Sequence, residues 1–414
     1  MLNQKHAGSL LTGLMIFVIL IAIGNFLSPG SQAIDQETQH RFRQVAVAAV
    51  NAERKAQGIE EKVVNDSELQ DWLDEYPESL ISNAARTSPD IFLEKLPSEK
   101  LTLSHASLYC ISAESPGSLA GQLDFWKEAF KTSTNVVAMR LYSNSNSNSK
   151  IGCILIAAKK VPKFDLALFN NGLSEFYVTC RHCNKPHIGT LTKCGLALAV
   201  KCSHCNHSYD LIAADMLGNY HRANDYLHGY RPPPETGSGA ATRIEELSAL
   251  WAAVIARCRY SKDLAGGNGK KDSWQTPSDT YSFRNGDCED TSLLLADWLI
   301  SRGFNTRVVI GHASGRGEHA WCVTKLEGRQ YLLETTLGKI PETPPETQLE
   351  TARYHPRFSF DRQNIYFING PSENVSDYFS PELWQPFSYP SSAATRVPSV
   401  ALNPLQPSQS QTNR

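Results

Sequence analysis

The sequence predicts an α+β protein in which an apolar helix packs on an antiparallel sheet. The stretch RNGDCEDTSLLLADWL, Arg284 to Leu299, passes from turn residues into an apolar run that indicates a helix. The runs AWCV and YLLE follow it, and the turn residues Glu327-Gly328-Arg329 between them predict an antiparallel hairpin. Nearer the N-terminus, VVAMRLY and IGCILIAAKKV flank the polar repeat SNSNSNSK and predict a second hairpin.

The length and the charge of the chain limit its organisation and its partners. It has 414 residues, which is enough for two or three domains of roughly 150 residues each. Its net charge of −2 gives no general attraction to nucleic acid, so we expect no nucleic-acid partner.

An apolar segment without charges, Leu10 to Leu27, lies near the N-terminus. It reaches the lower limit of what spans a bilayer and exceeds the usual core of a signal peptide. Ser31 and Ala33 follow as the small residues that a signal peptidase requires. Residues 1–33 are therefore expected to be a membrane anchor or a signal peptide. We expect a single-pass membrane protein with its bulk in the periplasm or outside the cell.

Residues 36–165 are predicted to form a mixed α/β domain. A helix containing Phe42 and Val50 is expected to end near Gly58, and a second helix is expected around Leu69 to Tyr76. The order of VNAERKAQGI, a region around Trp126 and a closing strand resembles the CAP (cysteine-rich secretory protein) fold. The histidines of that family's cleft have no counterparts here, so the resemblance implies a binding or spacer domain.

Two close pairs of cysteines mark the next region. Cys180 and Cys183 form one C-x2-C pair, and Cys202 and Cys205 form another after eighteen intervening residues. This is the spacing of a zinc ribbon, in which two tight turns present four thiolates to one Zn²⁺ ion. Residues 176–220 are predicted to be such a ribbon, with the Zn²⁺ structural. Two disulfides are the alternative if this region is exported.

The rest of the chain divides into a linker, a third domain and a tail. Three prolines and several small residues in RPPPETGSGAA predict a linker over residues 231–241. A domain is expected over residues 242–370. Residues 380–414 are rich in Ser, Pro and Gln, so we expect a disordered tail there.

Cys288 lies at the expected N-terminus of the apolar helix, where it is a candidate nucleophile. Unpaired amide hydrogens and the helix dipole stabilise a thiolate at such a position. Asp287 is placed to cap this helix, and Glu289 and Asp290 occupy its first turn. Because these carboxylates oppose a thiolate, the nucleophile needs a cationic partner.

His319 is the candidate for that partner, and Glu334 is the acid that would orient it. Both lie on the predicted hairpin, His319 at the start of AWCV and Glu334 at the end of YLLE. An imidazolium beside Cys288 would stabilise the thiolate, and Glu334 would fix its tautomer. His312 is a competing base, but no apolar strand follows it.

Trp274 to Thr336 resembles the transglutaminase-like cysteine hydrolase superfamily, and within it the bacterial transglutaminase-like cysteine proteinases. The pattern of these bacterial proteinases is W-x2-P-x-E, then GDCED, then HA with an aliphatic strand, then an acid that ends the next strand. The matching residues here are Trp274, Pro277, Asp279, Gly286, Asp287, Cys288, Glu289, Asp290, His319, Ala320, Leu333 and Glu334. Asp279 and Glu334 depart from the Glu and the Asp that are usual at these positions.

The resemblance implies a papain/transglutaminase-like core in which a nucleophile helix packs on an antiparallel sheet. It implies that Cys288 attacks an amide carbonyl and that His319 transfers the proton. Trp274 or Gln275, together with the backbone amide of Cys288, would stabilise the oxyanion.

The sequence therefore predicts a membrane-tethered cysteine hydrolase that cleaves a protein or peptide substrate, or another amide, through a thioester. Transglutaminase-type acyl transfer is an alternative. A peptide:N-glycanase-like amidase is another, since those enzymes also have paired cysteines before a transglutaminase core. A non-catalytic binding scaffold is the alternative outside enzymes.

Overall fold

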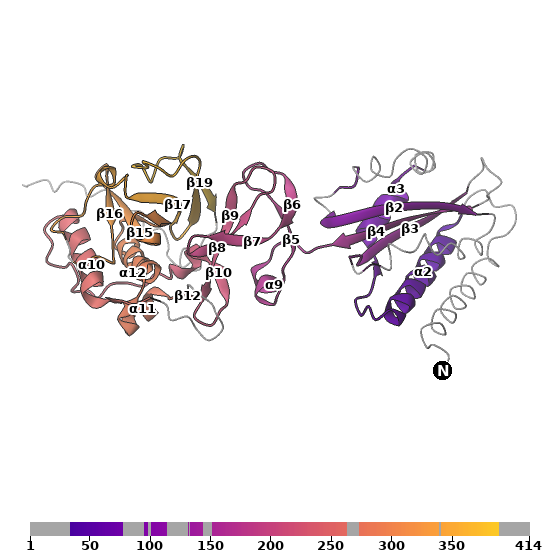
Figure 1. Ribbon diagram of the computed structural model, residues 1–414, viewed down its shortest axis with the longest axis horizontal. Coiled ribbons are helices and arrows are strands. Elements are labelled where there is room, and N and C mark those ends of the chain that lie inside the picture. Colours follow the sequence, from indigo (N-terminus) through magenta and orange to yellow (C-terminus); the bar gives the residue numbers. More distant parts are fainter. Residues whose placement is uncertain are drawn as a thin grey trace, which may run out of the picture. The chain divides into compact units, whose positions relative to one another are not determined.

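The computed structural model describes residues 34–77, 95–97, 101–113, 131, 133–143, 151–262, 273–338 and 341–388. The chain forms two compact units, which are described separately (Figure 1). The first contains the described residues of Met1–Asp165 together with Ser174–Thr179 and Asn184–Ile188. The second contains Leu166–Leu173, Cys180–Cys183 and the described residues of Gly189–Arg414.

The first unit has a four-stranded sheet of order β1-β3-β4-β2. Its elements are α2 (Gln36–Ala56), β1 (Val64–Asn65), α3 (Ser67–Glu75), β2 (Leu103–Ala113), β3 (Val136–Ser143) and β4 (Ile151–Lys160). Both predicted helices and the β3–β4 hairpin are confirmed, while the polar tip of the hairpin, residues 144–150, lies outside the described residues.

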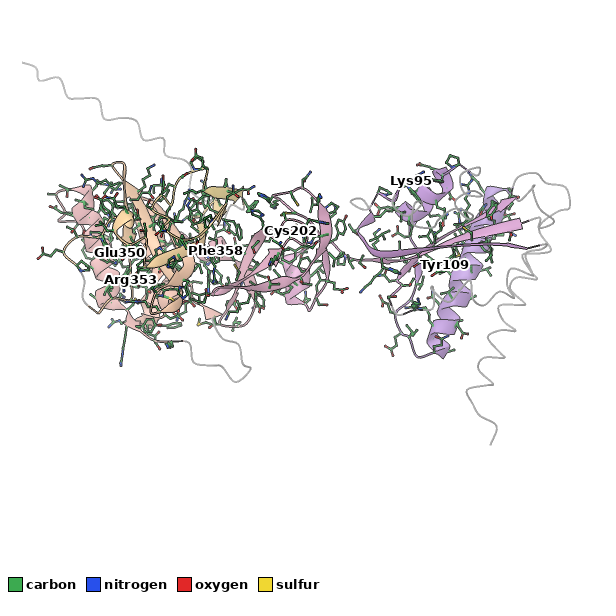
Figure 2. All side chains as sticks on the ribbon, turned by 45° about the horizontal axis from the view of Figure 1, so that its top comes forward. Lys95, Tyr109, Cys202, Glu350, Arg353 and Phe358 are labelled. Atoms are coloured by element: carbon green, nitrogen blue, oxygen red, sulfur yellow. The ribbon has the colours of Figure 1, made fainter. Side chains whose placement is uncertain are left out.

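Helices cover both faces of this sheet because successive strand residues point to opposite sides. Val137 and Met139 pack with Phe42 of α2, whereas Val136 and Ala138 pack with Leu69 of α3. On β2, Tyr109, labelled in Figure 2, packs against the α2 side. The CAP-like resemblance of this region stays a prediction.

The region of paired cysteines contains one hairpin and one larger sheet. The hairpin joins β5 (Phe176–Thr179) and β6 (Pro186–Gly189). The larger sheet has the order β10-β9-β8-β7, and its strands are β7 (Leu191–Cys194), β8 (Ala197–Lys201), β9 (Ser208–Asp215) and β10 (Tyr220–Arg222). A short helix, α9 (Leu166–Asn170), precedes the hairpin in the chain, and a 3-10 helix, η1 (Ala223–Tyr226), follows β10. A further strand, β12 (Ser273–Trp274), pairs in parallel with β9, so this sheet continues into the third predicted domain.

In its described residues, that domain has three α-helices, one 3-10 helix and a six-stranded antiparallel sheet of order β16-β15-β14-β17-β18-β19. Its helices and small strands are α10 (Arg243–Arg257), β11 (Arg259–Tyr260), α11 (Pro277–Phe283), β13 (Asn285–Gly286), α12 (Cys288–Ser301) and η2 (Thr347–Leu349). The sheet strands are β14 (Asn305–Ala313), β15 (Gly317–Leu326), β16 (Arg329–Leu333), β17 (Tyr354–Phe360), β18 (Asn364–Ile368) and β19 (Trp384–Ser388). The predicted α+β arrangement is confirmed here, since α12 packs on β14 and β15.

Helix α12 is the central helix of this domain. Its residues from Cys288 to Leu299 are all buried, as expected for a helix that is apolar around most of its circumference. Asp297, one of the buried acids on this helix, accepts hydrogen bonds from Arg362 and from the backbone N–H groups of Gly229 and Tyr230. Residues 231–241, the predicted linker, contain neither helix nor strand, and Arg302 at the end of α12 donates a hydrogen bond to the Thr236 carbonyl.

The prediction of a disordered tail over residues 380–414 is wrong for its first part, because residues 384–388 form β19, which pairs with β18. Trp384 and Phe387 are buried there, with 1% and 6% of their surface exposed, so two aromatic residues fix a segment of otherwise polar composition. The domain consequently extends beyond the predicted boundary at residue 370. Residues 389–414 lie outside the described part of the chain.

The expected membrane location is also corrected. The apolar segment of residues 1–33 lies outside the described residues. Within the described residues, no helix is both long enough and apolar enough to cross a bilayer. This finding contradicts the single-pass membrane location, and membrane tethering is not supported.

Candidate active site

The start of α12 places Cys288 at the junction of several tightly packed segments. The backbone N–H of Asp287 donates to Asp290 Oδ2 at 3.3 Å, and Thr291 Oγ1 donates to the Asp287 carbonyl at 2.7 Å. Gly286 is required for this close turn, because a Cβ built on it would lie 2.6 Å from the Cβ of Asp290. The predicted helix start at Cys288 is thereby confirmed.

The Cys288 thiol is buried among acidic groups. It is 5% exposed, and its Sγ donates to Glu289 Oε2 at 3.1 Å. Burial raises the pKa of Cys288 well above its usual value, and the carboxyl groups of Glu289 and Asp287 raise it further. The backbone N–H of Ala320, the residue after His319, donates to the thiol and acts in the opposite direction. The like-charge opposition expected from the sequence is therefore present.

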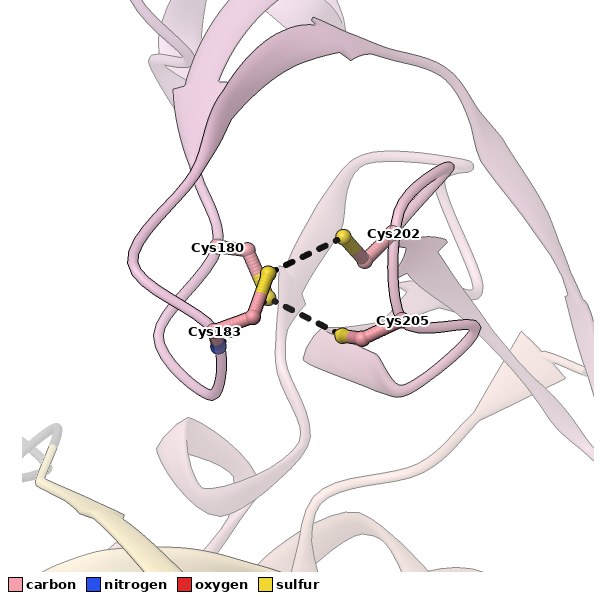
Figure 3. A group of neighbouring side chains, drawn as sticks. All are labelled: Cys180, Cys183, Cys202 and Cys205. Atoms are coloured by element: carbon pink, nitrogen blue, oxygen red, sulfur yellow. Dashed lines mark hydrogen bonds between the residues drawn. The ribbon is translucent and has the colours of Figure 1, made fainter.

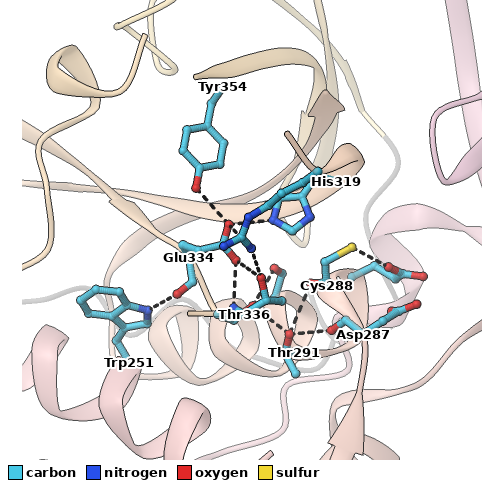
Figure 4. Close-up of polar contacts among 12 residues, drawn as sticks. Trp251, Asp287, Cys288, Thr291, His319, Glu334, Thr336 and Tyr354 are labelled. Atoms are coloured by element: carbon cyan, nitrogen blue, oxygen red, sulfur yellow. Dashed lines mark hydrogen bonds and ion pairs between the residues drawn. The ribbon is translucent and has the colours of Figure 1, made fainter. Parts of the chain in front are cut away.

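His319 and Glu334 form a close buried pair. The distance between His319 Nε2 and Glu334 Oε2 is 2.7 Å, and the two residues are 4% and 2% exposed. Since Nε2 of the ring contacts Glu334, the other ring nitrogen is Nδ1. Figure 4 shows the ring of His319 and the sulfur of Cys288 in the same site, and the Ala320 contact brings this strand against the thiol.

The β15–β16 hairpin explains why these two residues meet. Cys322 on β15 lies opposite Leu333 on β16, so the residue after Leu333 reaches the part of β15 that carries His319. The tight turn contains Glu327 and Gly328, both with positive φ, as two-residue hairpin turns require.

Glu334 has further partners on both carboxylate oxygens (Figure 4). Oε1 accepts the backbone N–H of Thr336 at 2.8 Å and its hydroxyl at 2.7 Å, and Oε2 accepts the Tyr354 hydroxyl at 3.0 Å. Arg316 lies 3.6 Å away as an ion-pair partner. Burial opposes ionisation of Glu334, but the hydrogen bond and charge of His319 and the bonds from Thr336 outweigh it and lower its pKa to about 2.

Trp274 and Gln275, the two oxyanion candidates, lie in different environments. Trp274 is buried and packs against Tyr226 and Phe360, with ring centroids 5.2 and 6.0 Å apart. The backbone N–H of Gln275 donates to Asp290 Oδ1 at 2.8 Å, which holds it at the start of α12. Two side-chain atoms, Trp274 Nε1 and Gln275 Oε1, are buried without a hydrogen-bond partner among the described residues. The indole N–H of Trp274 is a donor and the Oε1 atom of Gln275 is an acceptor, so both residues stay candidates.

The four paired cysteines lie close together (Figure 3), as predicted. Their sulfur atoms lie within 4.8 Å of one another, with 3.6 Å between Cys180 and Cys205 and 3.8 Å between Cys183 and Cys202. Backbone N–H groups of His182 and His204 donate to two of the sulfurs. Tetrahedral zinc with Zn–S bonds of about 2.3 Å places its sulfurs about 3.8 Å apart, which these distances match. The alternative of two disulfides is not present, since all four cysteines are free.

Sequence reasoning did not identify the residues that hold Glu334. Thr336 follows it by two positions, where a hydroxyl residue commonly caps a carboxylate, but Tyr354 and Arg316 come from other strands and turns. The competing base His312 is exposed on β14, where it lies opposite Glu318 and His355.

Known proteins are similar to the part of the chain that contains this site. Residues 272–386 match the family of the CEP76 peptidase-like domain. The human kyphoscoliosis peptidase is 24% identical over 166 residues, which are 37% of this chain and 23% of that protein. The chain thus spans less than a quarter of this curated relative.

Two solved structures show weak overall similarity. The EGTA-treated LapG of Legionella pneumophila has a TM-score of 0.26 and 16% identity, over 36% of this chain and 74% of that one. A putative cysteine protease of Cytophaga hutchinsonii has a TM-score of 0.22 and 11% identity, over 59% and 69%. The sequence match over residues 272–386 and the human relative support a likeness of this part of the chain to the transglutaminase-like cysteine peptidase superfamily.

Proposed function

We propose that the chain is a cysteine peptidase in which Cys288, His319 and Glu334 hydrolyse a peptide or other amide bond through a thioester. The observation that carries the proposal is the buried His319–Glu334 contact of 2.7 Å beside a thiol at a helix N-terminus. A nucleophile, a base and a group that orients the base are the elements that such chemistry needs.

In the first step the Cys288 proton moves to His319 Nδ1 and the sulfur attacks the carbonyl carbon of the substrate. The carbonyl π electrons move to oxygen, which becomes an oxyanion. The proposed donors to it are the backbone N–H of Cys288 at the start of α12 and either the Trp274 indole N–H or the Gln275 side-chain amide. His319 then gives the proton to the leaving amine, and the carbon–nitrogen bond breaks to leave a thioester.

In the second step water hydrolyses the thioester. His319 removes a proton from the water, the resulting hydroxide attacks the thioester carbon, and the proton returns to sulfur as the acid product leaves. Glu334 stays ionised throughout because its pKa is about 2, and it stabilises the imidazolium that forms in both steps.

For the four cysteines we propose a structural Zn²⁺ site. Four thiolates complete the coordination of zinc, which leaves no position for a substrate or water. The sulfur distances of 3.6 and 3.8 Å and the backbone N–H groups directed at the sulfurs support this role. The metal would fix the two turns and takes no part in amide cleavage.

Thiol labelling tests the proposed nucleophile and base. The full chain is treated with iodoacetamide at about pH 6, well below the pKa of a free thiol, and labelling of Cys288 is followed by peptide mass spectrometry. We expect His319→Ala to slow the labelling at least about tenfold. His312→Ala, an exposed histidine on the neighbouring strand, is the matched control and should leave the rate unchanged. Equal rates in wild type and His319→Ala would argue against the triad.

A substrate assay identifies the reaction. A mixed pool of peptides and glycopeptides with an added primary amine is incubated with wild type and with Cys288→Ala. We expect hydrolysed peptides only with the wild type; masses of amine adducts would instead indicate acyl transfer, and released glycans an amidase of glycopeptides. Hydrolysis that survives in Cys288→Ala would exclude this cysteine as the nucleophile.

A further inference from the structure

The first unit contains a polar cavity that the proposed reaction does not use. Its volume is about 410 Å³, which is within the range of small-molecule binding sites. All but one of its described lining residues are polar: Gln36, Gln39, His40, Arg43, Asp74 and Arg140. They come from α2, from the end of α3 and from β3, and in Figure 1 the two helices lie on either side of the sheet. The cavity is therefore suited to a hydrophilic ligand.

Two glutamines hold both helices at the edge of β3 beside this cavity. Strand β1 pairs with the first two residues of β3. Further along β3, Gln39 of α2 donates to the Leu141 carbonyl at 2.6 Å and accepts the Leu141 N–H at 2.9 Å. Gln70 of α3 makes the same two bonds with Met139, at 3.0 and 2.9 Å. Because α2 and α3 are bonded to the same strand in this way, the walls of the cavity are fixed.

The two guanidinium groups of the cavity are also held in place. Arg140 Nη1 donates to three carbonyl groups at the end of α3, at 2.6 to 3.1 Å. Arg43 donates its Nε to the Met139 carbonyl at 3.0 Å and its Nη2 to both carboxylate oxygens of Asp74 at 2.8 Å. The side chain of Arg43 is only 16% exposed. Groups that are fixed before binding lose little conformational freedom when a ligand binds.

The charges of the lining determine the class of ligand. The described lining contains two guanidinium groups and one carboxylate, that of Asp74, so one positive charge remains besides His40. No hydrogen bond within the described part of the chain uses Arg43 Nη1, which leaves a charged N–H donor for a ligand. A carboxylate matches the planar geometry of guanidinium N–H groups. Because Asp74 would repel further negative charge, the lining favours a monoanion.

We propose that this cavity binds a small hydrophilic monocarboxylate. Arg43 binds its carboxylate through Nη1. Gln36 and His40, which are exposed on the same face of α2 as Arg43, form hydrogen bonds with its hydroxyl or carbonyl groups. This binding role goes beyond the proposed function and does not depend on the triad.

Calorimetric titration of the full chain at pH 7.5 and low salt tests the proposal. The probes are lactate, pyruvate, glycerate and gluconate, and lactamide and sorbitol are the neutral counterparts of lactate and gluconate. We expect at least one of the four acids to bind with a Kd of about 1 mM or less, and neither neutral counterpart to bind. Added salt should weaken the complex, because the charged groups are partly exposed.

Three substitutions separate the charge of the cavity from the charge of the whole chain. Arg43→Gln should weaken binding at least about tenfold, whereas Asp74→Asn, which makes the lining more positive, should leave the affinity unchanged or increase it. Arg41→Gln is the matched control, because Arg41 is exposed on the same helix, pairs with Glu37 and does not line the cavity. Far-ultraviolet circular dichroism establishes that the variants are folded, and Asp74→Asn still tests the proposal if Arg43→Gln does not fold.

Several results would overturn the proposal. One is that none of the four acids binds with a Kd below about 1 mM, and another is that the neutral counterparts bind equally well. An equal loss of affinity in Arg41→Gln and Arg43→Gln would show a general effect of charge, and a loss in folded Asp74→Asn would contradict the role of positive charge. Tighter binding of inorganic phosphate than of every acid would exclude a carboxylate as the preferred ligand. Cys288→Ala should bind the acid with wild-type affinity, so a failure of the triad does not affect this test.

Discussion

Glu334 shows how one side chain is fixed by its immediate neighbours. Each of its oxygens accepts at least two hydrogen bonds, and the longer side chain still reaches His319 Nε2 at 2.7 Å. The departure from the more usual Asp is therefore accommodated by the hairpin, with Glu334 directly after the end of β16. The acid is positioned by contacts from Thr336 and Tyr354 as well as by its own strand.

The Glu334 carboxylate should remain ionised under acid conditions. Its pKa of about 2 lies below the ordinary value of 4.5, so its contribution to stability is present above pH 4.5 and is lost as pH falls toward 2. We expect Glu334→Gln to reduce kcat about 100-fold or more, because the imidazolium loses its partner. Tyr354→Phe removes one hydrogen bond and should cost about tenfold or less.

Acid unfolding measures the same carboxylate independently of activity. The loss of stability between pH 4.5 and pH 2 should be smaller in Glu334→Gln than in wild type and intermediate in Tyr354→Phe. An equal loss in wild type and Glu334→Gln would contradict the lowered pKa.

At the scale of elements, the start of α12 depends on a close approach of two backbone segments. Gly286 pairs with Tyr260 through β11 and β13, and it leaves no room for a Cβ beside Asp290. Asp290 in turn binds the backbone of Gln275. One turn thus holds Cys288, Gln275 and β11 in place.

Gly286→Ala should disturb this turn. A Cβ 2.6 Å from another Cβ forces a backbone shift, which we expect to cost about 1–3 kcal/mol of stability and to slow Cys288 labelling. Gly239→Ala is the control, since a Cβ there meets no atom within 4 Å. Thermal unfolding and labelling of both variants test the expectation, and equal behaviour of the two would refute it.

The elements near the site were largely predictable, because each follows from local patterns. The apolar run after GDCED predicts α12, and the alternation around Glu327 and Gly328 predicts the hairpin of His319 and Glu334. The site residues that were missed depend on tertiary contacts: Tyr354 reaches Glu334 from β17 and leaves no periodic signal. Strand β19 was not predicted because the surrounding tail is rich in polar residues and proline. The strand is fixed by only two buried aromatic residues, Trp384 and Phe387.

At the scale of the whole chain, the predicted ribbon and the third predicted domain share a sheet. β12 pairs with β9, and Gln275 follows β12 directly. His182, between the first two cysteines, also contacts Gln385 of β19 at 2.8 Å. Both links lie within the second unit. We therefore expect that a loss of structure in the two cysteine turns would also change the position of Gln275.

Metal removal tests this link. We expect one equivalent of zinc by elemental mass spectrometry in the wild type and in Cys194→Ser, which lies outside the cluster, and loss of zinc in Cys202→Ser. Loss of zinc, by chelation or substitution, should lower the melting temperature and increase hydrogen exchange at β12. If β12 in the protein without zinc shows the same hydrogen exchange as in the wild type, the metal does not influence the candidate active site.

Strand β19 also covers the edge of β18 and so prevents other polypeptides from pairing with it. The residues of β18, NIYFI, are uncharged and rich in aromatic and β-branched side chains, and β19 satisfies one edge of that strand along its full length. In a polypeptide that ends before Trp384, the backbone N–H and C=O groups on that edge of β18 would be unpaired. Such an edge can form hydrogen bonds with a strand of a second copy. Premature termination only a few dozen residues from the end should therefore cause self-association and aggregation rather than simple loss of a tail.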